Sequence, residues 1–184
     1  MLLDACVLYP APLRDTLMSL AVAELFQARW TDKIHEEWIG NLLENRSDLT
    51  REHLERTRDR MNESIEDSIV SGYEGLIETL QLPDPADRHV LAAAIHAQAQ
   101  IILTFNTKDF PSAVLSAYEI EICRPDTFVA GLFNQHPLDV VDALKMQRER
   151  LKKPLQPTDK FLETLSRQGL QRTVELLRPY TKLL

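Results

Sequence analysis

The sequence predicts an α/β fold with a parallel sheet, followed by a small all-α segment at the C-terminus. The first observation is a helix–strand unit at residues 82–111, in which residues 101–105 are an apolar, β-branched run typical of a strand buried on both faces. A second apolar strand is expected at residues 2–8. Beyond residue 137 we expect only two or three short helices, separated by Pro154, Pro157 and Gly169.

The composition is that of an ordinary globular chain. It has 184 residues, of which 44% are hydrophobic and 27% charged, which suits one domain with at most a small appendage. No apolar run approaches the ~20 residues that a membrane helix needs, and no signal peptide is visible, so we expect a cytoplasmic protein. The first strand begins so close to Met1 that a slightly longer start is expected. Cys6 and Cys123 are too few for a disulfide scaffold and are expected to be buried thiols.

Three helices are predicted between the two strands, at residues 13–28, 32–45 and 51–70. Thr31 and Thr50 stand where N-caps of the second and third helices belong. In the second helix Glu37 borders the apolar face, next to Trp38, which leaves a site role open. Glu36 is expected to be an ordinary solvated glutamate.

The central helix has a well-defined start. Asp84 is a good N-cap, and Pro85 suits the first helical position, where its missing N–H costs nothing. Asp87 then falls at the third position, from which its carboxylate can face the helix N-terminus and the sheet edge; capping and chemistry are both open for it. A last strand at residues 117–123 and a helix at residues 127–134 complete the α/β part.

Acidic residues accumulate where the strands are expected to end. Asp4 lies in an apolar strand, where a carboxylate is costly unless it is paired, hydrogen-bonded or bound to metal. Asp109 follows the central strand, at the rim where ligands bind in open α/β sheets. If Asp4, Glu37, Asp87 and Asp109 converge, they need a cation to remain ionised together. Their hard oxygen ligands suit Mg²⁺ or Mn²⁺, which support phosphodiester hydrolysis.

Four separated stretches resemble, in order and spacing, the signature stretches of PIN-domain ribonucleases, and most closely VapC-type toxins with a helical C-terminal extension. They are LLDACVLYP at 2–10, EEW at 36–38, DPADRHVLAAAI at 84–95 and TFNTKDFP at 104–111. The resemblance implies a Rossmann-like three-layer nuclease domain at 1–134 and a helical extension at 135–184. It further implies a Mg²⁺- or Mn²⁺-dependent endoribonuclease that acts on RNA, pairs with a cognate antitoxin protein and needs no membrane. It leaves a homodimer open.

The resemblance also implies site residues. Asp4, Glu37, Asp87 and Asp109 match the catalytic and metal-binding acids, and Thr104, Asn106, Arg88 and Lys108 are expected to bind substrate. Many relatives have Asp where this chain has Asn106, with another acid near Asp109. Asn106 then offers either an amide oxygen ligand or a phosphate contact, and the number of metal ions stays open.

Two other functions compete with the nuclease. The first is an RNA-binding or regulatory module of the same fold that cleaves weakly or not at all. The second is a phosphatase that forms an aspartyl-phosphate on Asp4; that class needs a second acid two residues later, where this chain has Cys6.

The charge of the chain is unevenly distributed. Residues 145–184 hold ten basic and four acidic residues, whereas the whole chain has a net charge of −7. Phosphate contacts by Lys and Arg dominate nucleic-acid affinity, so we expect Arg148, Lys152 and Lys153 to help capture RNA. The alternative is that this basic segment docks on the acidic remainder of the chain or on an acidic antitoxin.

Overall fold

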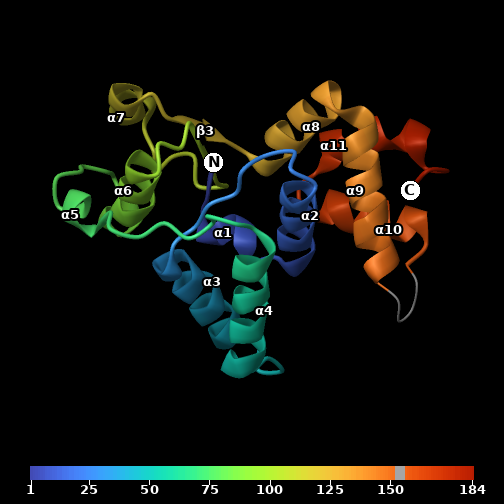
Figure 1. Cartoon of the computed structure of the whole chain (residues 1–184), viewed down its shortest axis with the longest axis horizontal. Coiled ribbons are helices and arrows are strands. Elements are labelled where there is room, and N and C mark those ends of the chain that lie inside the picture. The colour runs from blue at the N-terminus through green and yellow to red at the C-terminus, as the bar shows by residue number, and fades with distance from the viewer. Residues whose placement is uncertain (152–155) are drawn as a thin grey trace. The chain divides into compact units, whose positions relative to one another are not determined.

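The structure is a computed structural model that describes residues 1–151 and 156–184. It divides into two compact units (Figure 1): a sheet unit, Met1–Tyr9 with Gln27–Cys123, and a helical unit, Pro10–Phe26 with Arg124–Leu184. This division differs from the expected boundary after residue 134. The difference arises because two helices that were assigned to the nuclease domain pack against helices of the C-terminal segment.

The sheet is parallel, as the sequence predicts. Its strands, in spatial order, are β1 (Leu2–Leu3), β2 (Ile101–Leu103) and β3 (Glu121–Cys123). Two single parallel bridges, Leu2 with Arg29 and Trp30 with Ile69, continue the pairing beyond β1. The carboxyl ends of β1 and β2 therefore lie side by side at one rim, which is where a site is expected in this class of sheet.

The first strand is shorter than predicted. It ends at Leu3, and residues Ala5–Leu8 form a single helical turn, α1, with Asp4 at its N-cap position. The expectation of a strand over residues 2–8 is wrong because a short apolar run does not distinguish a buried strand from a buried helix. Ala5, Val7 and Leu8 are buried in either case.

The helices of the sheet unit begin largely where their caps predict. They are α3 (Asp32–Asn45), α4 (Arg51–Ser64), α5 (Glu74–Ile77), α6 (Arg88–His96) and α7 (Ser112–Leu115). The hydroxyls of Thr31 and Thr50 accept hydrogen bonds from the first turns of α3 and α4, which confirms both caps. The α4 helix ends six residues before the predicted residue 70, because residues 68–70 leave the helix to pair with Trp30.

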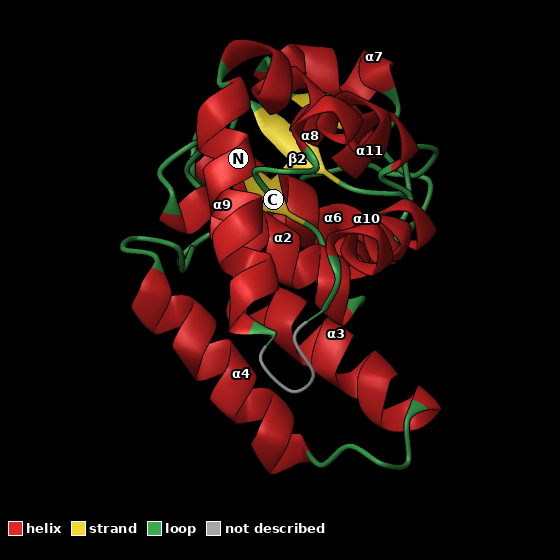
Figure 2. Cartoon of the chain, turned by 90° about the vertical axis from the view of Figure 1, so that its right-hand side faces the viewer, coloured by secondary structure: helices red, strands yellow, loops and turns green. Residues whose placement is uncertain are grey.

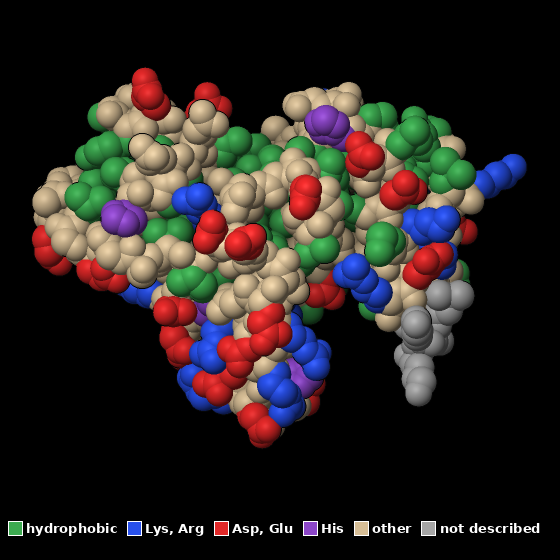
Figure 3. Space-filling model, viewed as in Figure 1, with side chains coloured by type: hydrophobic (Ala, Val, Ile, Leu, Met, Phe, Trp, Pro, Cys, Tyr) green, Lys and Arg blue, Asp and Glu red, His purple; other side chains and the backbone are tan. Residues whose placement is uncertain are grey.

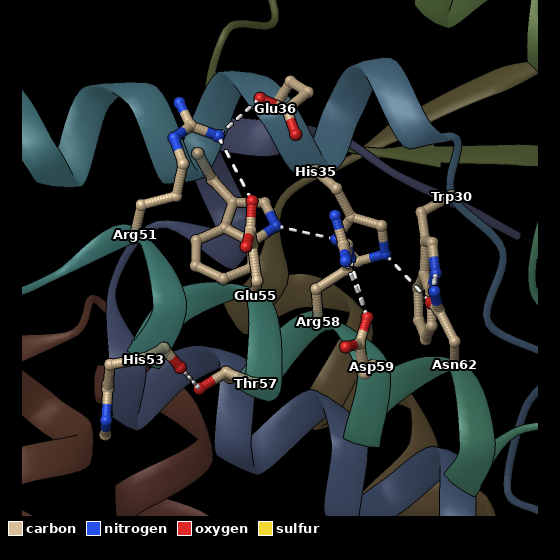
Figure 4. A network of polar contacts seen from close by, with 11 residues as sticks. Trp30, His35, Glu36, Arg51, His53, Glu55, Thr57, Arg58, Asp59 and Asn62 are labelled. Atoms are coloured by element: carbon tan, nitrogen blue, oxygen red, sulfur yellow. Dashed lines mark hydrogen bonds and ion pairs between the residues drawn. The ribbon is translucent and has the colours of Figure 1, made fainter.

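A buried polar network joins α3 to α4 (Figure 4). The side-chain oxygen of Asn62 accepts from Trp30 Nε1 at 2.8 Å and lies 3.0 Å from His35 Nε2. Trp38 Nε1 donates to His35 Nδ1 at 2.9 Å. Because an indole N–H can only donate, His35 Nδ1 must be the acceptor, and its Nε2 carries the proton that Asn62 receives.

The helical unit contains only helices and connections over its described residues, in agreement with the predicted all-α segment (Figure 2). Its main helices are α2 (Ala11–Val22), α8 (Pro125–Gln135), α9 (Pro137–Arg150), α10 (Thr158–Arg167) and α11 (Gln171–Leu177). In α9 Val141 and Leu144 are buried, whereas Leu138 is 60% exposed. No helix in the described residues is long and apolar enough to cross a membrane.

Candidate active site

Asp4 lies at the point where β1 ends. Its N–H donates to the carbonyl of Leu103, so the strand pairing fixes its backbone, and the residue is only 4% exposed. Its side chain makes no cap hydrogen bond to α1. Instead, Asp4 Oδ2 accepts from the hydroxyl of Thr104 at 2.6 Å. The carboxylate is therefore held at the rim shared by β1 and β2.

Cys6 shares this contact. Its thiol donates to the same oxygen, Asp4 Oδ2, at 3.1 Å, and lies 3.3 Å from the hydroxyl of Thr104. Burial, and then the charge of Asp4, raise the pKa of Cys6 to about 12, so the thiol keeps its proton at neutral pH. From the sequence, Cys6 was expected to be a buried thiol and served to argue against a phosphatase, but no site role was expected for it; its side chain is partly buried.

Thr104 does not lie where a substrate contact is expected. It is fully buried, and its hydroxyl proton is given to Asp4, so it holds a site residue rather than facing RNA. Asn106 and Lys108 follow it in an exposed turn. A hydrogen bond from the N–H of Asp109 to the carbonyl of Asn106 closes this turn. These two side chains are available to a ligand.

Asp87 carries the clearest electrostatic signature of the site. It is half-buried at the end of η1 (Pro85–Asp87), directly before α6, and its side chain makes no cap hydrogen bond. The cap is Asp84, as predicted, which accepts from the N–H of Ala86 at 2.8 Å. Burial and then the charges of Asp4, Asp109 and Asp84 raise the pKa of Asp87 to about 6. Asp4, Asp87 and Asp109 are thus close enough to act as one group of charges.

Glu37 points toward α6 rather than into solvent. Its Oε1 lies 2.7 Å from Nε2 of His89, whose side chain is 1% exposed. The neighbouring Glu36 is exposed and pairs with Arg51 at 3.0 Å, as expected for a surface glutamate (Figure 4). His89 is a second residue that the sequence analysis missed. His89 lies two residues after Asp87, and this spacing gave no sign that its side chain would contact Glu37 in α3.

Two cations adjoin these acids in the sequence. Lys108 is exposed in the turn before Asp109. Arg88 is half-buried, and its Nε is shielded from solvent with no hydrogen-bond partner among the described residues. A buried donor of this kind is costly unless a partner satisfies it. That Arg88 binds substrate stays a prediction.

The four acids do not form a ready-made metal cluster. Across the described residues, no three His, Cys, Asp or Glu side chains are close enough together to hold a metal ion. Glu37 is engaged by His89, whereas Asp4, Asp87 and Asp109 interact through their charges. Their donor chemistry nevertheless fits a hard divalent cation, which takes carboxylate and amide oxygens. A cation would also relieve the repulsion that raises the pKa of Asp87.

Comparisons with known proteins place the chain in a family. A PIN-domain family model matches residues 1–108, more than half of the chain, so the protein belongs to the PIN-domain family. A model of the VapC50 C-terminal domain matches residues 125–179. The resemblance to VapC-type proteins with a C-terminal extension is thereby confirmed.

A curated relative is the putative ribonuclease VapC50 of Mycobacterium tuberculosis, which is 43% identical over 58 residues. The match covers 32% of this chain and 34% of the relative, so it spans about a third of the relative's length. No solved structure matches the chain.

Proposed function

We propose that this protein is an endoribonuclease that hydrolyses RNA phosphodiester bonds with the help of Mg²⁺ or Mn²⁺. The observation that carries the proposal is that Asp4, Asp87 and Asp109 lie close enough to interact at the sheet rim: burial first, and then the charges of Asp4 and Asp109, raise the pKa of Asp87. Repelling carboxylates at a sheet rim are what a cation-dependent site requires. The PIN-domain match and the similarity to a relative named as a putative ribonuclease support the same conclusion.

In this proposal Asp4, Asp87 and Asp109 hold the cation, with Asn106 beside them. The bound cation supplies a more acidic water and stabilisation of charge on the phosphate oxygens. Arg88 and Lys108 position the scissile phosphate, since both lie next to the acids in sequence and guanidinium groups bind phosphate well. Glu37, oriented by its contact with Nε2 of His89, is the carboxylate assigned to accept a proton from the attacking water.

The test is cleavage of mixed single-stranded RNA with Mg²⁺ and with a chelator. We expect cleavage to stop on chelation, and to fall at least about 100-fold in Asp4→Asn and Asp87→Asn, as for the loss of a central electrostatic group. The neighbouring Glu36 provides a matched control. Glu36→Gln changes only a surface ion pair and should leave the rate within about threefold. Cleavage at the wild-type rate by folded Asp4→Asn would refute the mechanism.

One observation favours a second candidate, an RNA-binding or regulatory module that cleaves poorly. The acids are not assembled into a metal cluster across the described residues, and Glu37 is held by His89. The two functions differ in a single measurement. A module would bind RNA and release it uncleaved in saturating Mg²⁺ or Mn²⁺, whereas a nuclease would convert it to shorter products.

We further propose that the protein is the toxin of a toxin–antitoxin pair, acting in the cytoplasm where RNA is the substrate. Its match to a VapC50 C-terminal domain supports this. Expression of the wild type in bacteria should arrest growth, Asp4→Asn should not, and co-expression of the cognate antitoxin should restore growth. The homodimer stays a proposal, which sedimentation of the purified protein would decide.

A further inference from the structure

The side-chain oxygens of Asp4 are not equivalent. Oδ2 receives two donors, the hydroxyl of Thr104 at 2.6 Å and the thiol of Cys6 at 3.1 Å. Oδ1 accepts no hydrogen bond from the described residues. A carboxylate held in this way keeps one defined oxygen, Oδ1, free of donors from the described residues.

The direction of each hydrogen bond follows from the backbone. The N–H of Asn106 donates to the hydroxyl oxygen of Thr104 at 2.9 Å, and the N–H of Phe105 donates to the sulfur of Cys6 at 3.2 Å. A backbone N–H can only donate, so each side chain accepts from the backbone and passes its own proton on. Thr104 has one proton and Cys6 has one proton, and each gives it to Asp4 Oδ2, so the 3.3 Å approach of the thiol to the Thr104 hydroxyl is a close contact with no proton of its own to donate.

We infer that Cys6 is a positioning residue of the active site: its thiol, together with Thr104, fixes the carboxylate of Asp4 so that Oδ1 faces the divalent cation. Cys6 also holds the chain at Phe105, directly before the turn that carries Asn106 and Asp109. One side chain thus sets the geometry of ligands from two elements. Outer partners of this kind are typically worth 10–100-fold in metal affinity.

This inference rests on the proposed cation site, and its test measures binding rather than cleavage. The probe is Mn²⁺, titrated into the full-length, metal-free protein with free Mn²⁺ read by electron paramagnetic resonance. The informative pair of variants is Cys6→Ser and Cys6→Ala. The serine hydroxyl can still donate a hydrogen bond to Asp4, whereas the alanine methyl group cannot. The control is Cys123→Ala, which removes the chain's other cysteine, on β3.

We expect Cys6→Ala to weaken Mn²⁺ binding about tenfold, and Cys6→Ser and Cys123→Ala to stay within about threefold of the wild type. Thermal unfolding in the absence of metal separates positioning from packing. If Cys6 serves only packing, Cys6→Ala and Cys6→Ser will both be less stable than the wild type, and the two variants will bind Mn²⁺ with equal affinity. That result, or wild-type affinity in Cys6→Ala, overturns the inference.

Failure of the proposed function looks different. If the wild type binds no Mn²⁺, the cation site itself is wrong, and the inference falls with it. If the wild type binds Mn²⁺ and all three cysteine variants bind equally well, the cation site stands and only the role of Cys6 is refuted.

Discussion

At the scale of single residues, Asp87 gives the most direct prediction about stability. Its raised pKa means that the ionised carboxylate is disfavoured in the folded, metal-free protein by burial and by Asp4 and Asp109. We expect Asp87→Asn to increase the free energy of unfolding at pH 7.5 by about 1 kcal/mol, after allowance for solvent screening at this half-exposed group. Urea unfolding with a chelator present checks this; an unchanged or lower stability contradicts it.

The same residue predicts a pH dependence. Its folded pKa of about 6 lies above its ordinary value of 3.8, so the folded state binds the proton more tightly. The stability that protonated Asp87 contributes is fully present below about pH 4 and is lost as the pH rises to about 6. The difference in stability between Asp87→Asn and the wild type should therefore grow between pH 4 and 6 and stay constant above. A difference that shrinks over this range would contradict the assignment.

At this scale the sequence predicted roles that depend on neighbouring residues, but not contacts between side chains from different elements. Asp84 as a cap and Glu36 as a surface residue follow from local spacing, and both are confirmed. Cys6 and His89 were missed because their partners come from other elements. The Phe105 contact of Cys6 spans 99 positions, and His89 meets Glu37 across α3 and α6. No local pattern encodes such contacts.

At the scale of elements, the α3–α4 pair depends on Asn62. Its removal leaves the donors of Trp30 and His35, both fully buried, without their shared acceptor. We expect Asn62→Ala to cost about 2–3 kcal/mol, since each unsatisfied buried donor carries a desolvation penalty. Asn45→Ala is the matched control, because Asn45 is exposed and, among the described residues, its side chain bonds to the carbonyl of Asn41 in the same helix. Equal effects of the two substitutions in chemical denaturation would show that the network is not stabilising.

Helix starts were predictable and strand ends were not, for a physical reason. A cap is a local hydrogen bond, so Thr31 and Thr50 could be identified from their neighbours. A strand ends where its partner ends, and that is decided by a distant segment. Thus α4 stops at Ser64 because the following residues pair with Trp30, and β1 stops at Leu3 where Asp4 turns into α1.

At the scale of the whole molecule, charge is distributed over both units, and acidic and basic side chains mingle on the α3–α4 arm in the view of Figure 3. The expectation that Arg148 captures RNA does not fit its contacts. Arg148 lies in α9, and its guanidinium donates to the carbonyls of Leu184 at 2.7 Å and Gln156 at 2.8 Å. Both partners lie within residues 145–184, so these bonds hold the segment together; docking on the acidic remainder of the chain or on an antitoxin stays a prediction. Lys152 and Lys153 lie outside the described residues.

We therefore expect Arg148→Ala to destabilise the protein by about 2 kcal/mol, the value of hydrogen bonds from a charged group, and to leave RNA affinity and its salt dependence unchanged. Lys182→Ala, which removes an exposed cation of the same unit, is the control for stability. A uniform loss of RNA affinity with a shallower salt slope in Arg148→Ala, at unchanged stability, would restore the capture role.

The class of fold was predictable because the pattern of apolar strands and capped helices is repeated along the chain. The division of the chain into a sheet unit and a helical unit could not be predicted in the same way. Residues 10–26 look like an ordinary crossover helix of the nuclease domain, yet α2 packs against α9 and joins the helical unit. In the helical unit, the carboxylate of Asp126 in α8 accepts from the first N–H groups of α11. Pairings between helices 46 and 47 positions apart leave no local sign in the sequence.

The central claim is that Asp4 and Asp87 share a divalent cation at the sheet rim. Its most direct test is anomalous diffraction from crystals of the protein soaked in Mn²⁺, using a preparation that cleaves RNA with Mn²⁺. We predict an anomalous peak roughly 2.1 Å from a carboxylate oxygen of each residue, with Asp4 binding through Oδ1. A crystal with full Mn²⁺ occupancy elsewhere, and none between Asp4 and Asp87, would contradict the account.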